Sequence, residues 1–173
     1  MRIRLLVLYP IREYRQTMND QQTALKNQLL EACYVKQQAL INDFKIRIKA
    51  LLQVDGLGNE EEYDNNQQAN ASQNITEADA LNQELIFANA EMKLLRKLES
   101  LISVKHNCVE FGAVVKTDKR TFFISTSIEE FVINNKTFVG LSTKSALYSA
   151  MKGLRTGDDF SYHGIPYKII DIF

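Results

Sequence analysis

A short acidic stretch holds the side chains with the most evident capacity for chemistry. Residues 54–66 read V-D-G-L-G-N-E-E-E-Y-D-N-N, with two glycines and five acids. The acids are Asp55, Glu60, Glu61, Glu62 and Asp64. Carboxylate oxygens are ligands that Mg²⁺ accepts together with substrate phosphates. An acidic run in a loop is more often a solvated surface, so these residue types alone do not assign a metal site.

Long helical patterns flank this stretch on both sides. From about residue 19 to residue 53, apolar residues recur mainly in steps of three, four and seven, and neither Gly nor Pro interrupts them. This spacing predicts one helix with a single apolar stripe, about 50 Å long at 1.5 Å per residue. The predicted stripe consists of Leu25, Leu29, Cys33, Leu40, Phe44, Ile48 and Leu51.

A second apolar stripe follows the acidic stretch and predicts a second long helix. Thr76 with Asp79 resembles a capping box, but residues 67–72 are also compatible with a helix, so both starts stay open. The stripe consists of Leu81, Leu85, Ala88, Met92, Leu95 and Ile102, widened by Leu94, Leu98 and Leu101.

The two stripes can be buried in two ways. They can pair as an antiparallel coiled-coil hairpin over residues 18–105, or each helix can form a parallel dimeric coiled coil with a second copy. Asp55-Gly56 and Gly58-Asn59 supply turn chemistry between the stripes and favour the hairpin. In a hairpin, the acids near residues 54–66 would form its tip.

Composition excludes several function classes. Basic and acidic residues balance at 21 each, so no basic excess points to duplex DNA binding. Cys33 and Cys108 lack the spacing of a zinc site, and we expect reduced thiols in a cytoplasmic protein. His106 and His163 are isolated in sequence, and we expect each at a surface or turn.

Residues 1–17 do not follow the helical pattern, and we treat them as a leader of uncertain structure. Their apolar run from Ile3 to Tyr9 contains Arg4 and ends at Pro10 without a small-residue cleavage site, which argues against a signal peptide. No segment approaches the roughly 20 apolar residues of a membrane span.

After residue 106 the pattern changes to strands, turns and one helix. Segments rich in β-branched and aromatic residues predict strands at 109–115, 121–126, 131–133, 137–139, 159–162 and 167–173. Asn134-Asn135 predicts a hairpin turn. Residues 142–152 predict a helix with Leu147, Ala150, Met151 and Leu154 on one face. The whole chain is therefore predicted to be α+β, with a small antiparallel sheet and one helix over residues 106–173.

Two segments of this C-terminal part carry family motifs. Residues 109–115, V-E-F-G-A-V-V, are similar to an opening strand V-x-F-G-S-x-V, and residues 142–173 are similar to the closing run of the same family. The family is that of the bacterial Gre transcript-cleavage factors. Its usual proline after the serine is replaced here by Ala146, which follows Ser145. The order of a helical hairpin, an acidic tip and a small domain is also that of the family.

The resemblance implies a function. It implies an FKBP-like fold for residues 106–173, binding to RNA polymerase, and insertion of the hairpin into the polymerase's secondary channel. There the tip carboxylates would help hold an Mg²⁺ ion of the polymerase, which then cleaves backtracked RNA. The free protein would bind no cofactor, would act as a monomer away from membranes, and would meet nucleic acid only through the transcription complex.

The resemblance also points to particular tip residues. The family motif D-L-x-E-N-A-E-Y matches this chain at Leu57 and at Glu62-Tyr63. That alignment places the two functional acids of the family on Gly56 and Asn59, while Asp55 and Glu60 are each one residue away. Asp55 and Glu60 are thus the candidates to share the Mg²⁺ ion, with Glu61, Glu62 and Asp64 as accessory carboxylates.

Other function classes stay open at this point. One is a coiled-coil interaction module without catalytic effect, and a related one is a polymerase-binding inhibitor that supports no cleavage. A peptidyl-prolyl isomerase is suggested only by analogy of fold, which is weak support for a function.

Overall fold

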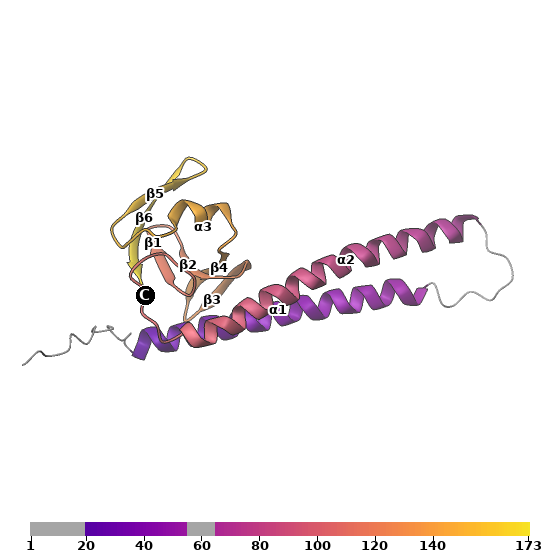
Figure 1. Ribbon diagram of the computed structural model, residues 1–173, viewed down its shortest axis with the longest axis horizontal. Helices are drawn as coiled ribbons and strands as arrows, with labels where there is room; N and C mark the ends of the chain where they lie inside the picture. Colours follow the sequence, from indigo (N-terminus) through magenta and orange to yellow (C-terminus); the bar gives the residue numbers. More distant parts are fainter. Residues whose placement is uncertain (1–19, 55–64) are drawn as a thin grey trace, which may run out of the picture.

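The computed structural model describes residues 20–54 and 65–173, and it is α+β. Two N-terminal helices are followed by a six-stranded mixed sheet and a further helix (Figure 1). Residues 1–17 and the five acids predicted at the tip lie outside the described residues. Among the described helices, none is long and apolar enough to cross a membrane.

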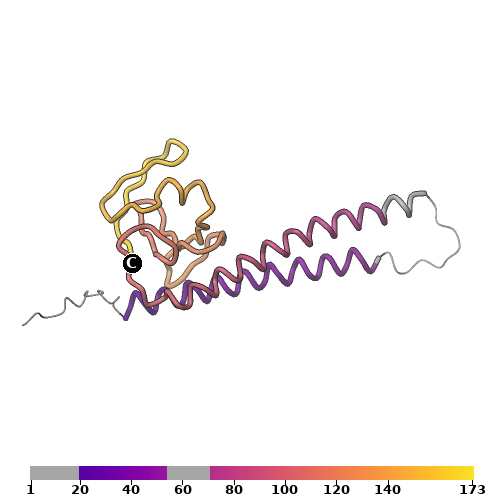
Figure 2. The backbone as a smooth tube through the Cα atoms, viewed as in Figure 1, coloured from indigo at the N-terminus to yellow at the C-terminus, as the bar shows by residue number. Residues whose placement is uncertain are grey.

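The two long helices lie side by side and run in opposite directions (Figures 1 and 2). They are α1 (Asp20–Val54) and α2 (Asn65–Leu98), and the short helix η1 (Glu99–Leu101) continues α2. α2 begins at the earlier of the two predicted starts. Thr76 is no cap, because its hydroxyl donates to the Ser72 carbonyl oxygen at 2.9 Å inside the helix.

The buried stripe of α1 differs from the predicted one at two places. Lys26 and Leu30 are buried in addition to the predicted residues, and farther along the helix Gln37 and Ile41 take the place of Leu40. Leu40 is 43% exposed, whereas Gln37 and Ile41 are buried. The predicted step of seven from Cys33 to Leu40 passed over Gln37 because it is polar. Gln37 can be buried because its side-chain amide donates to the Ala88 carbonyl oxygen on α2 at 2.9 Å. The other predicted positions are buried or half-buried.

The sheet has the order β3-β4-β2-β1-β6-β5. Its strands are β1 (Val114–Thr117), β2 (Thr121–Ser125), β3 (Ile128–Ile133), β4 (Lys136–Ser142), β5 (Asp159–Tyr162) and β6 (Ile165–Ile172). The prediction of an antiparallel sheet is wrong at one pair, because β2 and β4 are parallel. After β2 the chain passes the end of β4 through Thr126 and Ser127, so that β3 forms the outer edge and β4 returns between β3 and β2.

Gly140 is the residue that makes this crossing possible. A Cβ atom at position 140 would lie 2.6 Å from Cβ of Ile128 and 2.8 Å from the Thr126 carbonyl oxygen. β3 and β4 are joined by the predicted turn, where Asn134 and Asn135 both have positive φ, 50° and 59°. That turn is confirmed.

The predicted strand at residues 109–115 is wrong over most of its length. β1 begins only at Val114, because Gly112 turns the chain with a φ of +91°. Val109 instead pairs with the segment after the third helix, donating to the Leu154 carbonyl oxygen at 2.8 Å and accepting from the Gly153 amide at 2.9 Å.

The predicted helix at residues 142–152 is shorter than expected. Ser142 belongs to β4, and α3 (Ala146–Met151) starts after Ser145, whose hydroxyl accepts from the Tyr148 amide at 3.1 Å. Ala150, predicted on the buried face, is exposed, and Tyr148 is buried with Met151.

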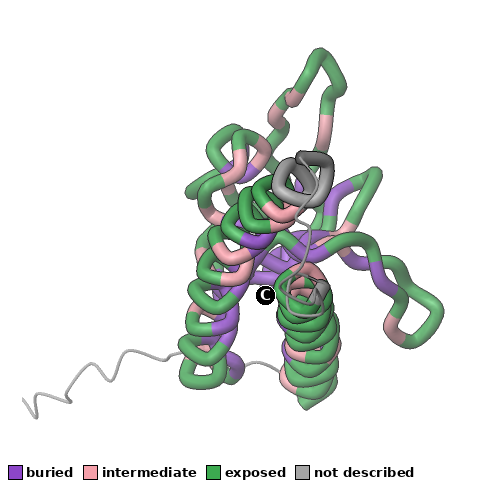
Figure 3. Tube along the Cα trace, turned by 90° about the vertical axis from the view of Figure 1, so that its right-hand side faces the viewer, coloured by how far each residue is buried: buried purple, intermediate pink, exposed green. Residues whose placement is uncertain are grey.

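The sheet is covered on both faces, which gives two apolar clusters. One joins α1 and α2 to the sheet and includes Leu29, Cys33, Leu95, Leu98, Phe123, Phe131, Phe138 and Phe173. The other joins the sheet to α3 and includes Val115, Phe122, Ile124, Tyr148, Met151 and Ile169. The N-terminal half of α1 and the C-terminal half of α2 therefore pack against the sheet. Figure 3 colours the backbone by burial and shows that exposed residues predominate along the parts of the long helices that extend past the sheet.

Candidate functional site

The acidic stretch is carried by the ends of α1 and α2 that lie farthest from the sheet (Figure 1). Asp55, Glu60, Glu61, Glu62 and Asp64 are outside the described residues, so their side chains have no geometry here. Their neighbours in the chain, Val54 and Asn65, end and begin the two long helices. The described structure therefore shows that the acidic stretch connects the far ends of two long helices in the sequence.

A thin seam joins the helices beyond the sheet. Ala78 and Leu81 of α2 are buried there, and Phe44 and Ile48 of α1 are half-buried. This apolar contact continues the larger cluster beneath the sheet toward the distal ends.

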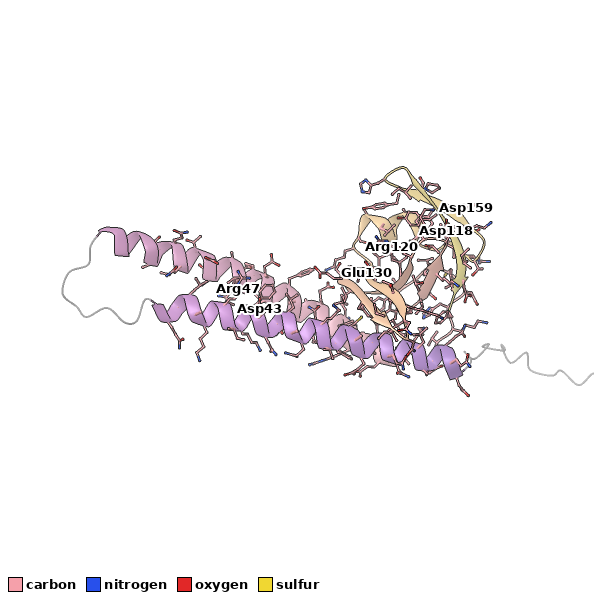
Figure 4. The ribbon with its side chains drawn as sticks, turned by 180° about the vertical axis from the view of Figure 1, so that it is seen from behind. Asp43, Arg47, Asp118, Arg120, Glu130 and Asp159 are labelled. Carbon is pink, nitrogen blue, oxygen red and sulfur yellow. The ribbon has the colours of Figure 1, made fainter. Side chains whose placement is uncertain are left out.

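One arginine, Arg47 of α1, links the two helices across this seam. Its guanidinium lies 3.8 Å from the Glu77 carboxylate on α2 and 3.9 Å from Asp43, one turn earlier on α1. Arg47 and Asp43 lie on the distal half of α1 (Figure 4). All three side chains are about half exposed, so each pair contributes about 0–1 kcal/mol. Together with the bond between Gln37 and Ala88 nearer the sheet, the pair across the seam shows a constant antiparallel register.

At the opposite end, a buried lysine ties α1 to the segment that leads into the sheet. Lys26 is fully buried, and its Nζ donates to the Val104 carbonyl oxygen at 3.0 Å. Burial lowers the pKa of Lys26 to about 8, while the negative charge of Glu110 acts in the opposite direction. Sequence reasoning missed this residue, although Lys26 lies three residues before Leu29 and so falls on the apolar face.

The prediction of a surface position for His106 is wrong. The side chain is almost fully buried, and its Nδ1 lies 2.7 Å from Oε1 of Glu110. Its Nε2 is buried without a hydrogen-bond partner among the described residues. Burial lowers the pKa of His106, and the bond to Glu110 opposes that shift. The imidazole ring packs closely against the backbone at Gly112, where a Cβ atom would lie 3.2 Å from Nε2. His163 is exposed in a turn, as predicted.

A shallow polar pocket of about 160 Å³ lies at the turn between β1 and β2, lined by Asp118, Arg120 and Glu130 among others (Figure 4). Of the acids that line this pocket, Asp118 already accepts hydrogen bonds from other parts of the protein. Asp118 accepts from the Lys168 amide at 2.9 Å and from Lys119 Nζ at 2.8 Å, and these bonds lower the pKa of its carboxyl group. The hydrogen bond from Lys168 thus links the turn between β1 and β2 to β6.

Metal-ligating side chains do not cluster in the part of the chain that the structure describes. Nowhere in residues 20–54 and 65–173 do three His, Cys, Asp or Glu side chains gather as metal ligands would. Cys33 and Cys108 are free thiols, as predicted, and burial raises the pKa of Cys33 to about 12. A thiol that stays protonated is a poor nucleophile. Glu91 is buried with no hydrogen bond to its carboxylate within this part of the chain, and nothing in the structure explains it.

No protein-family model matches the chain, and no curated protein sequence matches it. Function is therefore inferred from the residues, from the geometry of the described part, and from the resemblance of the motifs.

Proposed function

We propose that the chain is a Gre-like transcription elongation factor that binds RNA polymerase and promotes cleavage of backtracked RNA. In this proposal α1 and α2 form a coiled-coil hairpin, and the sheet with α3 forms an FKBP-like domain that docks on the polymerase. One observation carries the proposal. Two antiparallel helices of 35 and 34 residues extend past the sheet, and the chain between their far ends holds five carboxylates.

The shape suits a protein that works inside another enzyme. Each helix is about 50 Å long, and the distal part of the pair is only two helices thick. The apolar cluster beneath the sheet holds the near end of the pair, and the Arg47 bridge joins the helices farther out. Such an element can reach a recessed active site that a compact domain cannot enter.

The proposed chemistry is accessory. Asp55 and Glu60 would complete the ligand shell of an Mg²⁺ ion that the polymerase supplies, with Glu61, Glu62 and Asp64 adding negative charge nearby. Bound Mg²⁺ stabilises charge on phosphate oxygens and activates a water molecule for attack. This chain would supply oxygen ligands and their position, and the catalytic centre would remain that of the polymerase.

A second candidate is an interaction module that pairs with another coiled coil. It is favoured by large apolar side chains that the helix pair leaves exposed. They are Val35, Leu40, Ile46, Leu52, Ile75, Ile86 and Phe87, which are between 43% and 68% exposed. Apart from the adjacent Ile86 and Phe87, these residues are separated along the helices, and they form no heptad stripe of their own. The first function therefore remains the better supported.

Size-exclusion chromatography of the chain mixed with core RNA polymerase separates the two. We expect the chain to co-elute with the polymerase and, alone, to elute as a monomer. Absence of co-elution, together with a dimer of the chain alone, would instead support the interaction module.

A further inference from the structure

A groove runs along the part of α1 that packs near the sheet and the end of α2. It consists of two adjoining depressions of about 970 and 690 Å³. The first lies between α1 and β3, and the second lies between α1 and the end of α2. They share Glu31, Tyr34, Val35 and Glu99, so they form one surface that follows α1 from residue 27 to residue 42.

The floor of the groove is apolar and open to solvent. Val35 of α1 and Val132 of β3 are 61% and 63% exposed, the highest values among the large apolar side chains that line it. Leu30 and Phe131 beneath them belong to the buried cluster that joins the helices to the sheet. An apolar surface continuous with a core, and bordered by polar groups, is typical of a binding site.

Two carboxylates stand at the centre of this groove. Tyr34 donates a hydrogen bond to Oε1 of Glu99 at 2.7 Å. Burial, this bond and the charges of Glu99 and Glu31 raise the pKa of Tyr34 to about 12, with Arg96 acting against them. Lys36 and Arg96 are the basic residues that line the groove. The groove therefore offers apolar contact, two acids where its depressions join, and two basic residues, Lys36 and Arg96.

We propose that residues 2–9 of this same chain, R-I-R-L-L-V-L-Y, dock in the groove. The segment lies outside the described residues, and its composition complements the surface. Six of its eight side chains are apolar or aromatic, and the other two are Arg2 and Arg4. The arginines match the carboxylates of Glu31 and Glu99, and the apolar residues match the floor of the groove.

The chain lengths fit this placement. The groove begins seven residues into α1, which is about 11 Å from its start, and extends for about 22 Å along the helix. Residues 10–19 can span up to about 33 Å, and eight extended residues cover about 26 Å, close to the length of the groove. Covalent attachment also gives the segment a high effective concentration, which an unattached partner lacks.

The absence of tryptophan from the chain gives a direct test. In full-length Leu6→Trp protein, the single indole reports burial through its emission maximum and its quenching by acrylamide. We expect blue-shifted emission and low quenching. Val35→Asp or Val132→Asp, added to this protein, places a carboxylate against the apolar segment and should lower the ratio of docked to undocked chain at least about tenfold. Both sites are exposed, so circular dichroism should show an unchanged fold.

Ile46→Asp is the matched control, since Ile46 is 68% exposed on the same helix but does not line the groove. It should leave the emission of the indole at position 6 unchanged. Emission of an exposed indole in the Leu6→Trp protein would overturn the proposal, as would an equal response to Val35→Asp and Ile46→Asp. Burial that disappears on dilution would also overturn it, because the segment would then be docking on a second copy.

Discussion

Gln37 of α1 donates a hydrogen bond from its buried side-chain amide to the carbonyl oxygen of Ala88 on α2, at 2.9 Å. This is a buried polar contact between the two helices, and it lies nearer the sheet than the exposed Arg47–Glu77 pair. A buried amide without a partner is costly, so the pairing of the helices is favoured in a register that places an accessible carbonyl oxygen opposite Gln37. The bond between Gln37 and Ala88 therefore helps to set how α1 and α2 are aligned.

Replacing this glutamine tests that role. Gln37→Ala should lower the free energy of unfolding by about 1–3 kcal/mol, because it removes a buried hydrogen bond and leaves a cavity. Gln38→Ala is the matched control, since Gln38 is exposed and bonds to Asn42 on its own helix. Urea denaturation measures both. Equal small losses for the two variants would show that the buried amide has no special role.

Position 140 in β4 should accept only glycine, because the segment that connects β2 to β3 passes close to its backbone. Gly140→Ala should destabilise the protein by about 3 kcal/mol or more, because the new Cβ would overlap Ile128 and the Thr126 carbonyl oxygen. Gly153→Ala provides a comparison, since Gly153 has a φ of +77° but open space around it. Backbone strain alone should cost about 1 kcal/mol there. Thermal denaturation that ranks the two variants in the reverse order would contradict this explanation.

The buried lysine should make stability depend on pH in the alkaline range. The pKa of Lys26 is about 8 in the folded protein and 10.5 as its ordinary value, so between these values the unfolded chain binds more protons. The contribution of Lys26 to the free energy of unfolding should therefore rise with pH from about 8 toward 10.5. Below pH 8 Lys26 is charged in both the folded protein and the unfolded chain. The buried charge then lowers the stability of the folded protein by its full amount.

Lys26→Met isolates this effect. Cys33 and Tyr34 have ordinary pKa values of 9.0 and 10.0 in the unfolded chain but pKa values of about 12 in the folded protein, so these two groups lower stability as the pH rises above about 9. They are common to both proteins, so the difference in unfolding free energy between wild type and Lys26→Met removes their contribution. That difference should shift in favour of the wild type between about pH 8 and 9.5. A difference independent of pH would show that Lys26 keeps an ordinary pKa.

Much of the fold follows from the sequence because its signals are local. The first helix was expected over residues 19–53 and is found at Asp20–Val54, since uninterrupted apolar spacing depends only on neighbours along one helix. The turn at Asn134 and Asn135 was expected for the same reason, because these residues tolerate positive φ.

The remaining features depend on contacts between distant parts of the chain. The burial of Gln37 requires Ala88, the burial of His106 requires Glu110 and Gly112, and the parallel pairing of β2 with β4 requires β3 to take the outer edge. The spacing of four from Cys33 to Gln37 places Gln37 on the apolar face of α1, but no local pattern reveals the partners that these buried polar groups find elsewhere in the chain. The predicted tip acids and the Gre-like activity stay predictions, because residues 55–64 lie outside the described structure.

RNA cleavage in a stalled, backtracked transcription complex with Mg²⁺ tests the central claim most directly. We predict that the purified chain shortens the RNA, and that a variant with Asp55, Glu60, Glu61, Glu62 and Asp64 replaced by alanine still co-elutes with polymerase but cleaves at least about tenfold more slowly. Equal RNA shortening by the wild type and by the alanine variant, or none by either while both are bound, would contradict a function for the tip carboxylates in cleavage.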